Sequence, residues 1–113
     1  MGSCIFCSII KGEVASEIVY ESDEFIVIKD IAPKAPVHLL LMPKRHIETL
    51  NDMRSSDSAL LGAMHYKAIQ LAARFGIAES GYKIITNTGA DGGQVVKHVH
   101  IHLLGGKKLS GEV

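Results

Sequence analysis

Three histidines alternate with apolar residues near the end of the chain, in the segment His98-Val99-His100-Ile101-His102-Leu103-Leu104. Successive side chains of an extended strand point to opposite faces, so a period of two places all three histidines on one face. A helix would turn His100 away from the other two and would leave Val99 and Ile101 without a common face. The pattern therefore predicts a strand over residues 95–104, with a row of imidazoles on one side.

Neighbouring imidazoles cannot all be protonated near neutral pH, because like charges lower one another's pKa. At least one ring is then a free base that can act as nucleophile, general base or metal ligand. The glycine-rich loop before the histidines, Gly89-Ala90-Asp91-Gly92-Gly93, allows backbone amides to converge on an anion. Phosphate held beside a neutral imidazole is suited to nucleotidyl transfer. The alternatives are a solvent-facing histidine row and a loop that uses glycine only for its turn.

Hydrophobic periodicity predicts the remaining elements. We expect strands over 18–21, 25–28, 38–42 and 82–88, a short N-terminal helix over 4–11 and a helical turn over 45–50. One long helix opens at Ser55-Ser56-Asp57 and ends before Gly76. Its apolar stripe is Leu60, Leu61, Met64, Ala68, Leu71, Ala72 and Phe75. These elements predict an α+β fold with a mostly antiparallel five-stranded sheet, as one domain over 1–113. Open sheet edges favour a dimer.

Composition excludes several classes of protein. The chain has 113 residues, 47% of them hydrophobic, so it is not a disordered chain. Its 12 Lys and Arg residues balance 12 Asp and Glu residues, which argues against a nucleic-acid partner. No apolar stretch is long enough to cross a bilayer, and the N-terminus is unlike a secretory signal. We therefore expect no membrane partner and a cytoplasmic location.

Two cysteines stand in the spacing Cys4-Ile5-Phe6-Cys7. One turn of backbone can direct both thiols at a single metal ion, and the same spacing occurs in redox dithiols. Two buried thiols that behave as small hydrophobes are the third possibility.

Taken together, these motifs resemble the histidine triad (HIT) superfamily. The alternating segment matches its His-φ-His-φ-His-φ-φ motif, where φ is apolar. Further matching segments follow the expected order: Cys4-Ile5-Phe6-Cys7, Asp30-Ile31-Ala32-Pro33, His38 to His46, and Gly92-Gly93-Gln94. The chain is most similar to the Hint branch, the histidine triad nucleotide-binding proteins, which hydrolyse purine nucleoside phosphoramidates.

The resemblance implies a role for each matching residue. His100 is the expected nucleophile, which forms a nucleotidyl-histidine and expels an amine; His102 contacts the phosphate, and His38 supports the site. Asp30 is expected to bind the ribose hydroxyls, although it could be only a turn residue. The other expected nucleotide-binding residues are Phe6, Ile9 and Ile31 around the purine, and Asn87, Gly93, Gln94 and Val95 near the phosphate. Phe6, Ile9 and Ile31 could instead be plain core, and Asn87 could be only a turn residue.

The resemblance also implies a structural zinc ion. Some bacterial HIT proteins hold zinc through a Cys-x-x-Cys pair and two histidines, and here Cys4, Cys7, His46 and His98 match that set. Such a four-ligand site stabilises the fold and takes no part in the chemistry. We expect no organic cofactor, a purine nucleotide substrate derived from AMP or GMP, and a homodimer.

One departure from the family pattern concerns Val95. Many members carry a serine there, so a hydroxyl near the leaving amine is missing. A dinucleoside polyphosphate hydrolase, as in the Fhit branch, is a second interpretation. A third is a zinc-stabilised nucleotide-binding module with little turnover.

Overall fold

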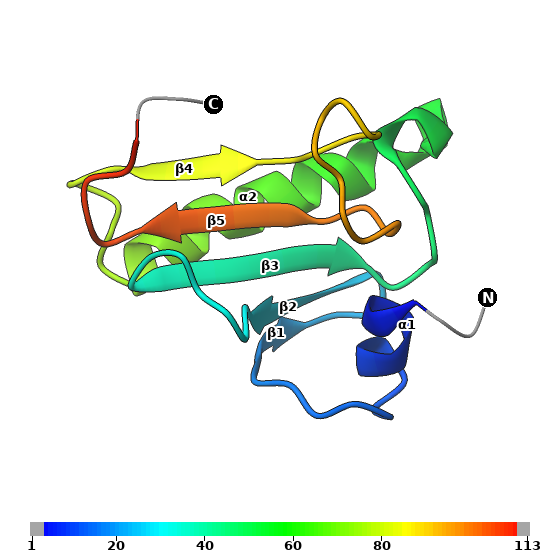
Figure 1. Ribbon diagram of the computed structural model, residues 1–113, viewed down its shortest axis with the longest axis horizontal. Coiled ribbons are helices and arrows are strands. Elements are labelled where there is room, and N and C mark those ends of the chain that lie inside the picture. The colour runs from blue at the N-terminus through cyan, green and yellow to red at the C-terminus, as the bar shows by residue number, and fades with distance from the viewer. Residues whose placement is uncertain (1–3, 111–113) are drawn as a thin grey trace.

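The structure is a computed structural model and describes residues 4–110. Its centre is a five-stranded antiparallel sheet with the order β1-β2-β3-β5-β4 (Figure 1). The strands are β1 (Ile18–Glu21), β2 (Phe25–Lys29), β3 (Val37–Pro43), β4 (Tyr82–Ile85) and β5 (Ile101–Gly105). The helices are α1 (Ile5–Ile10), η1 (Leu50–Asp52), η2 (Ser55–Asp57) and α2 (Ser58–Arg74). The predicted α+β class and sheet are confirmed.

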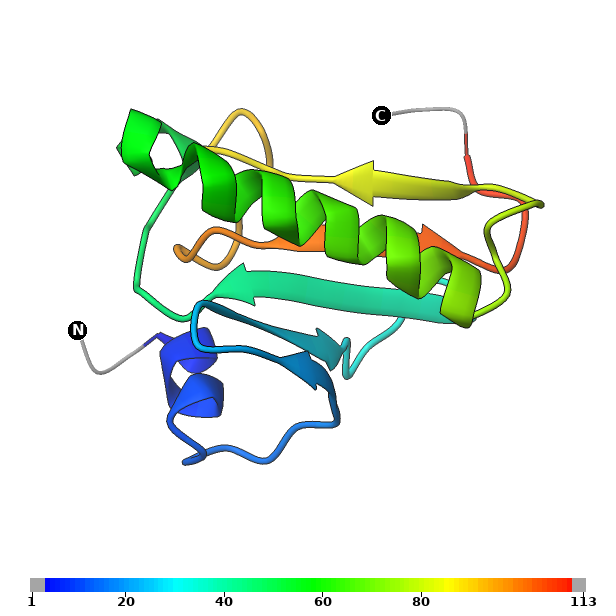
Figure 2. The same ribbon diagram turned by 180° about the vertical axis from the view of Figure 1, so that it is seen from behind.

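Helix α2 covers one face of the sheet, across β3, β5 and β4 (Figure 2). The predicted stripe is the buried side of this helix, and Gly76 follows it with a φ of 76°. The stripe packs on alternate residues of the central strands: Val27, Leu39, Leu41, Ile101 and Leu103. This face therefore holds the larger hydrophobic core.

The opposite face carries α1 and a smaller core. Phe6 packs there against the other alternate residues of β2 and β3, namely Ile26, Ile28, Leu40 and Met42. His102 lies directly opposite Leu40 in the β3–β5 register, so both side chains project to the α1 face. His100 and His102 lie next to this smaller core, where His100 contacts Phe6 and His102 pairs with Leu40.

The histidine segment is less regular than predicted, because β5 begins at Ile101 and not at residue 95. The β3–β5 ladder ends at the pair Leu41–Ile101, and Pro43, which lacks an N–H, closes β3 two residues later. Upstream of the ladder, the Val99 amide donates to the Ile47 carbonyl at 2.7 Å. His98 and His100 therefore precede the strand, and only His102 lies within it.

Two other boundaries differ from the sequence prediction. Residues 45–49 are not helical, and the short 3-10 turn η1 begins only at Leu50. Strand β4 ends at Ile85 instead of residue 88, where the chain turns into the glycine-rich loop. Within residues 4–110, no helix is long and apolar enough to cross a membrane.

Candidate active site and metal centre

A cavity of about 670 Å³ opens on the α1 face of the sheet. It gathers most of the predicted nucleotide-site residues from distant parts of the chain: Phe6, Ile9, Asp30, Ile31, Asn87, Gly93, Val95, His100 and His102. Ile31 is 99% exposed and Val95 is 90% exposed, so both side chains stand at its mouth, available to a ligand. His100 is buried at 7% exposure and forms part of its inner wall.

The position of the proton on His100 follows from its backbone partner. Its Nδ1 lies 2.7 Å from the His98 carbonyl oxygen, which can only accept, so Nδ1 carries the proton and donates it. In the neutral ring, Nε2 then carries no proton and has a free lone pair. A buried imidazole with a free Nε2 in a cavity wall is chemically equipped to be a nucleophile.

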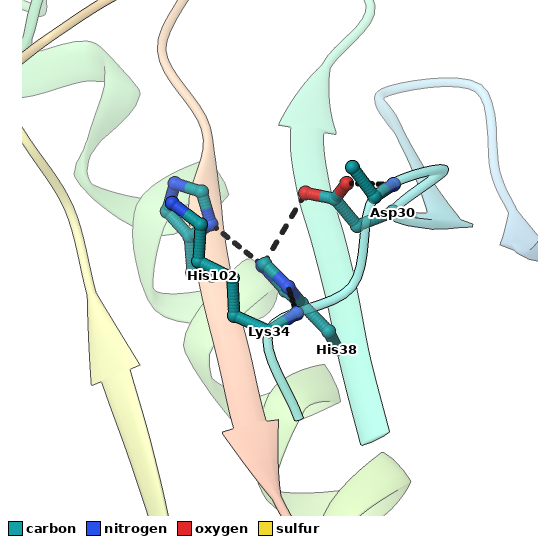
Figure 3. A network of polar contacts seen from close by, with 5 residues as sticks. Asp30, Lys34, His38 and His102 are labelled. Atoms are coloured by element: carbon teal, nitrogen blue, oxygen red, sulfur yellow. Dashed lines mark hydrogen bonds and ion pairs between the residues drawn. The ribbon is translucent and has the colours of Figure 1, made fainter. Parts of the chain in front are cut away.

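A second chain of hydrogen bonds settles the tautomers of His38 and His102 (Figure 3). The Lys34 amide donates to His38 Nδ1 at 3.1 Å, so the proton of neutral His38 is on Nε2. That Nε2 lies 3.0 Å from His102 Nδ1, which must accept. His102 therefore carries its own proton on Nε2, where it can donate to a ligand anion.

His38 and His102 are both held neutral. Burial, and then the neighbouring His100 and His38 rings, lower the pKa of His102 to about 4. Burial also lowers the pKa of His38, against the opposing effect of the Asp30 carboxylate. At neutral pH His102 is thus a hydrogen-bond donor and not a cation, and it leaves the adjacent His100 free of a positive neighbour.

Asp30 combines the two roles that the sequence left open. Its Oδ1 accepts the Ala32 amide at 2.8 Å, which is a turn interaction. Its Oδ2 lies 3.4 Å from His38 Nε2, and the side chain also lines the cavity. Asp30 is therefore both a turn residue and a carboxylate available to a ligand hydroxyl.

The glycine-rich loop is braced by two amide side chains. Asn87 Nδ2 donates to the Gly92 carbonyl at 2.7 Å, and Gln94 Oε1 accepts the Gly89 amide at 2.9 Å. Gly93 has a φ of 79°, and its amide donates to Ala90 within the loop at 3.1 Å. Gln94 is absent from the cavity lining, so its observed contacts are with the loop itself and with the Glu48 and Val96 carbonyls.

The four predicted metal ligands meet beside the cavity. The ligand atoms of Cys4, Cys7, His46 and His98 all lie within 4.8 Å of one another. Sulfur-to-nitrogen distances are 3.5 Å for Cys4–His98, 3.7 Å for Cys7–His98 and 3.2 Å for Cys7–His46, each to Nδ1. A tetrahedral zinc ion holds such ligand atoms about 3.6 Å apart. This cluster can therefore hold a metal.

The surroundings of the cluster orient its ligands. His98 Nε2 donates to the Pro43 carbonyl at 2.7 Å, which leaves the Nδ1 lone pair facing the thiols. Cys4 also accepts the Cys7 amide as the N-cap of α1, at 3.4 Å. Burial, followed by the neighbouring Cys4, raises the pKa of the Cys7 thiol. A bound cation would lower the pKa of the thiols again and favour the thiolates.

A second close group, Asp30, His38 and His102, is organised differently. The Lys34 amide keeps the proton of His38 on Nε2, the atom that would have to bind the ion. The group therefore acts as a hydrogen-bond network and not as a metal centre.

Sequence reasoning missed some contributors to the cavity. The loop between α1 and β1 supplies Val14, Ala15, Ser16 and Glu17, which carry no motif. Lys34 also lines the cavity, and its backbone amide sets the tautomers of two histidines. A backbone donor leaves no mark in the residue types.

Comparisons with known proteins identify the family of this chain. A family model described as "Scavenger mRNA decapping enzyme C-term binding" matches residues 3–112. The purine nucleoside phosphoramidase of Escherichia coli K12 is 46% identical over 105 residues, which cover 93% of this chain and 88% of the relative. A HIT-like protein of Chlamydia muridarum is 57% identical over 106 residues, covering 93% of this chain and 82% of the relative.

Solved structures are similarly close. A HIT family hydrolase from Legionella pneumophila Philadelphia 1 superposes with a TM-score of 0.93 at 42% identity, covering 97% of this chain and 98% of that one. A histidine triad protein from Clostridium difficile gives a TM-score of 0.93 at 39% identity, covering 100% of this chain and 98% of that one. The matches span nearly the whole length of both partners. The chain therefore belongs to the histidine triad family of hydrolases.

Proposed function

We propose that the protein hydrolyses purine nucleoside 5′-phosphoramidates through a covalent intermediate on His100. The observation that carries the proposal is the 2.7 Å hydrogen bond from His100 Nδ1 to the His98 carbonyl, which leaves Nε2 free beside the protonated Nε2 of His102. The 46% identical phosphoramidase of Escherichia coli supports the choice of substrate.

The reaction has two displacements at phosphorus. His100 Nε2 attacks, a P–N(histidine) bond forms, and the P–N bond to the amine breaks; the departing amine takes up a proton from solvent at the cavity mouth. Water then attacks the same phosphorus, His100 leaves, and the nucleoside monophosphate is released with one proton. The His102 Nε2–H donates to a phosphate oxygen in both steps, where charge accumulates.

The remaining cavity residues divide between base, ribose and phosphate. Phe6, Ile9 and Ile31 would form the apolar surroundings of the purine, and Asp30 would accept from the ribose hydroxyls. Asn87, Gly93 and Val95 lie on the loop side, where the phosphate and the amine would sit. Gln94 would act through the shape of that loop.

Zinc is the metal we propose for the cluster of Cys4, Cys7, His46 and His98. Two sulfur and two imidazole ligands at tetrahedral spacing are the donor set typical of structural zinc. A bound zinc ion would tie α1 to the segments that carry His46 and His98. We also propose a homodimer, since β1 and β4 are open edges of the sheet.

The test is release of AMP from adenosine 5′-phosphoramidate by the wild-type protein, His100→Ala and, as a matched histidine control, His65→Ala on α2. We expect release by wild type and His65→Ala and none above background by His100→Ala, while AMP binding persists. Wild-type protein that binds AMP without releasing it from the phosphoramidate would reject the hydrolase in favour of a nucleotide-binding module. Undiminished release by His100→Ala would reject the covalent mechanism.

A further inference from the structure

The two carboxylate oxygens of Asp30 have different surroundings. Oδ1 accepts the Ala32 amide at 2.8 Å and is held by the turn. Oδ2 lies 3.4 Å from His38 Nε2 (Figure 3). The side chain is 19% exposed and lines the cavity, whereas the His38 side chain is 2% exposed. A ligand hydroxyl that reaches Asp30 therefore meets an oxygen that is already in contact with His38.

His38 has one proton on Nε2 and two acceptors for it. His102 Nδ1 lies at 3.0 Å and Asp30 Oδ2 at 3.4 Å, on different sides of the N–H. A hydrogen bond weakens steeply as it bends, so the proton cannot serve both acceptors well. The carboxylate competes with His102 for the proton that holds the His102 ring through Nδ1.

We propose that Asp30 is a positioning residue that couples occupation of the ribose subsite to the orientation of His102. When a vicinal diol donates to Oδ2, the carboxylate loses part of its hold on the His38 proton. The His38 N–H then aligns with His102 Nδ1, and the His102 Nε2–H is held toward the phosphate. This inference rests on the proposed function and adds that the ribose hydroxyls assist turnover as well as binding.

Kinetics with a matched substrate pair test the coupling: adenosine 5′-phosphoramidate and its 2′,3′-dideoxy analogue. In the wild type we expect the dideoxy substrate to have a higher KM and a kcat lower by about tenfold, because an oriented donor to the phosphate is lost. Equal kcat values for the two substrates, with a difference confined to KM, would overturn the proposal.

Variants locate the coupling within the network. His38→Phe removes the shared proton, so the kcat values of the two substrates should converge while the KM difference persists. Asp30→Asn keeps an oxygen for the Ala32 amide and should remove both differences, which also covers the case in which His38→Phe does not fold. Asp23→Asn, at an exposed position in the turn between β1 and β2, should keep the wild-type ratios. A wild-type kcat ratio in Asp30→Asn would contradict the proposal.

A spectroscopic readout separates this inference from the proposed function. Nitrogen-15 NMR of histidine-labelled protein reports the His102 tautomer and its hydrogen bonds without any turnover. Saturating AMP should sharpen and shift the His102 Nδ1 signal, and saturating 2′,3′-dideoxy-AMP should leave it as in the free protein. Identical His102 signals with both nucleotides would overturn the coupling, whereas failure to release AMP would reject only the hydrolase.

Discussion

His98 and His100 are two residues apart, and each donates one ring N–H to a backbone carbonyl at 2.7 Å. They use opposite nitrogens. His98 donates from Nε2 to Pro43, so its lone pair is on Nδ1 and faces two thiols. His100 donates from Nδ1 to His98, so its lone pair is on Nε2, in the wall of the cavity.

Residue type alone therefore does not decide what these histidines can do. One backbone acceptor leaves the first ring able to bind a metal ion, and another leaves the second ring able to act as a nucleophile. The two groups share one neighbour, because the Phe6 ring lies edge-on to both His98 and His100, with centroid distances of 5.9 and 4.9 Å. Two chemically distinct centres are thus built from one short segment.

The largest expected effect separates the two histidines by function. His100→Ala should lower the rate of AMP release by at least about a thousandfold, since a nucleophile has no substitute, with little change in Tm. His98→Ala should instead abolish stoichiometric metal binding and lower Tm. AMP release should be affected less, because the backbone carbonyl that holds His100 remains. Rate assays, metal analysis and thermal melts check the pair. Equal activity losses in both variants, at unchanged metal content, would contradict the division.

Metal removal should affect stability before chemistry. If the cluster binds zinc, a chelator should lower the free energy of unfolding by about 4 kcal/mol, the value for free metal at a thousand times its Kd. Cys7→Ser should bring a similar loss and make the protein indifferent to the chelator. Denaturant unfolding with and without chelator measures both, and a chelator effect that persists in Cys7→Ser would place the metal elsewhere.

Acid should lower the stability of the fold, because His102 must be protonated. Its pKa is lowered to about 4 in the folded protein, below the ordinary value of 6.5, so the unfolded chain binds more protons between these values. Stability is therefore lost as the pH falls from 6.5 to 4. The full shift corresponds to about 3 kcal/mol, and because the ring is only partly buried we expect about 2 kcal/mol from this residue. Urea unfolding across that range should show a shallower pH dependence in His102→Asn than in wild type. Parallel profiles would contradict the assignment.

A smaller effect is expected at the ring that joins the two centres. Phe6→Leu removes edge-on contacts with both histidines but keeps an apolar side chain. We therefore expect the free energy of unfolding to fall by about 1 kcal/mol. Both metal affinity and kcat should fall modestly. A loss in one and not the other would indicate that the two centres are independent.

The smallest effect concerns the cavity mouth. Val95 is 90% exposed, so Val95→Ser should change the free energy of unfolding by less than about 0.5 kcal/mol. One added hydroxyl near the departing amine should raise kcat by up to about fivefold, the equivalent of one neutral hydrogen bond. An unchanged or lower kcat would mean that the hydroxyl does not reach the amine.

Much of the fold could be predicted from hydrophobic periodicity. The stripe of α2 and the edges of β1 are where the pattern places them, because burial on one face leaves a direct mark on the sequence. The histidine segment was expected to be a strand from residue 95, but Pro43 ends its partner and β5 begins only at Ile101. The alternation predicted that the histidines lie close together, but it did not predict that His98 and His100 precede the strand.

The tautomers lay beyond the sequence. They depend on the Pro43 and His98 carbonyls and on the Lys34 amide, groups that every residue possesses in some form. The candidate metal ligands His46 and His98 are far apart in the chain and meet where the segment after β3 lies against the segment before β5. The family resemblance named these distant ligands, but only a three-dimensional structure places the backbone groups that set the tautomers.

The most direct test of the account is the identity of the phosphorylated nitrogen. Wild-type protein should be quenched during turnover of adenosine 5′-phosphoramidate, digested, and examined by mass spectrometry and phosphorus NMR for a nucleotidyl-histidine. We predict a single adduct, on Nε2 of His100. An adduct on Nδ1 of His100, or on His102, would contradict the hydrogen-bond assignment on which the mechanism depends.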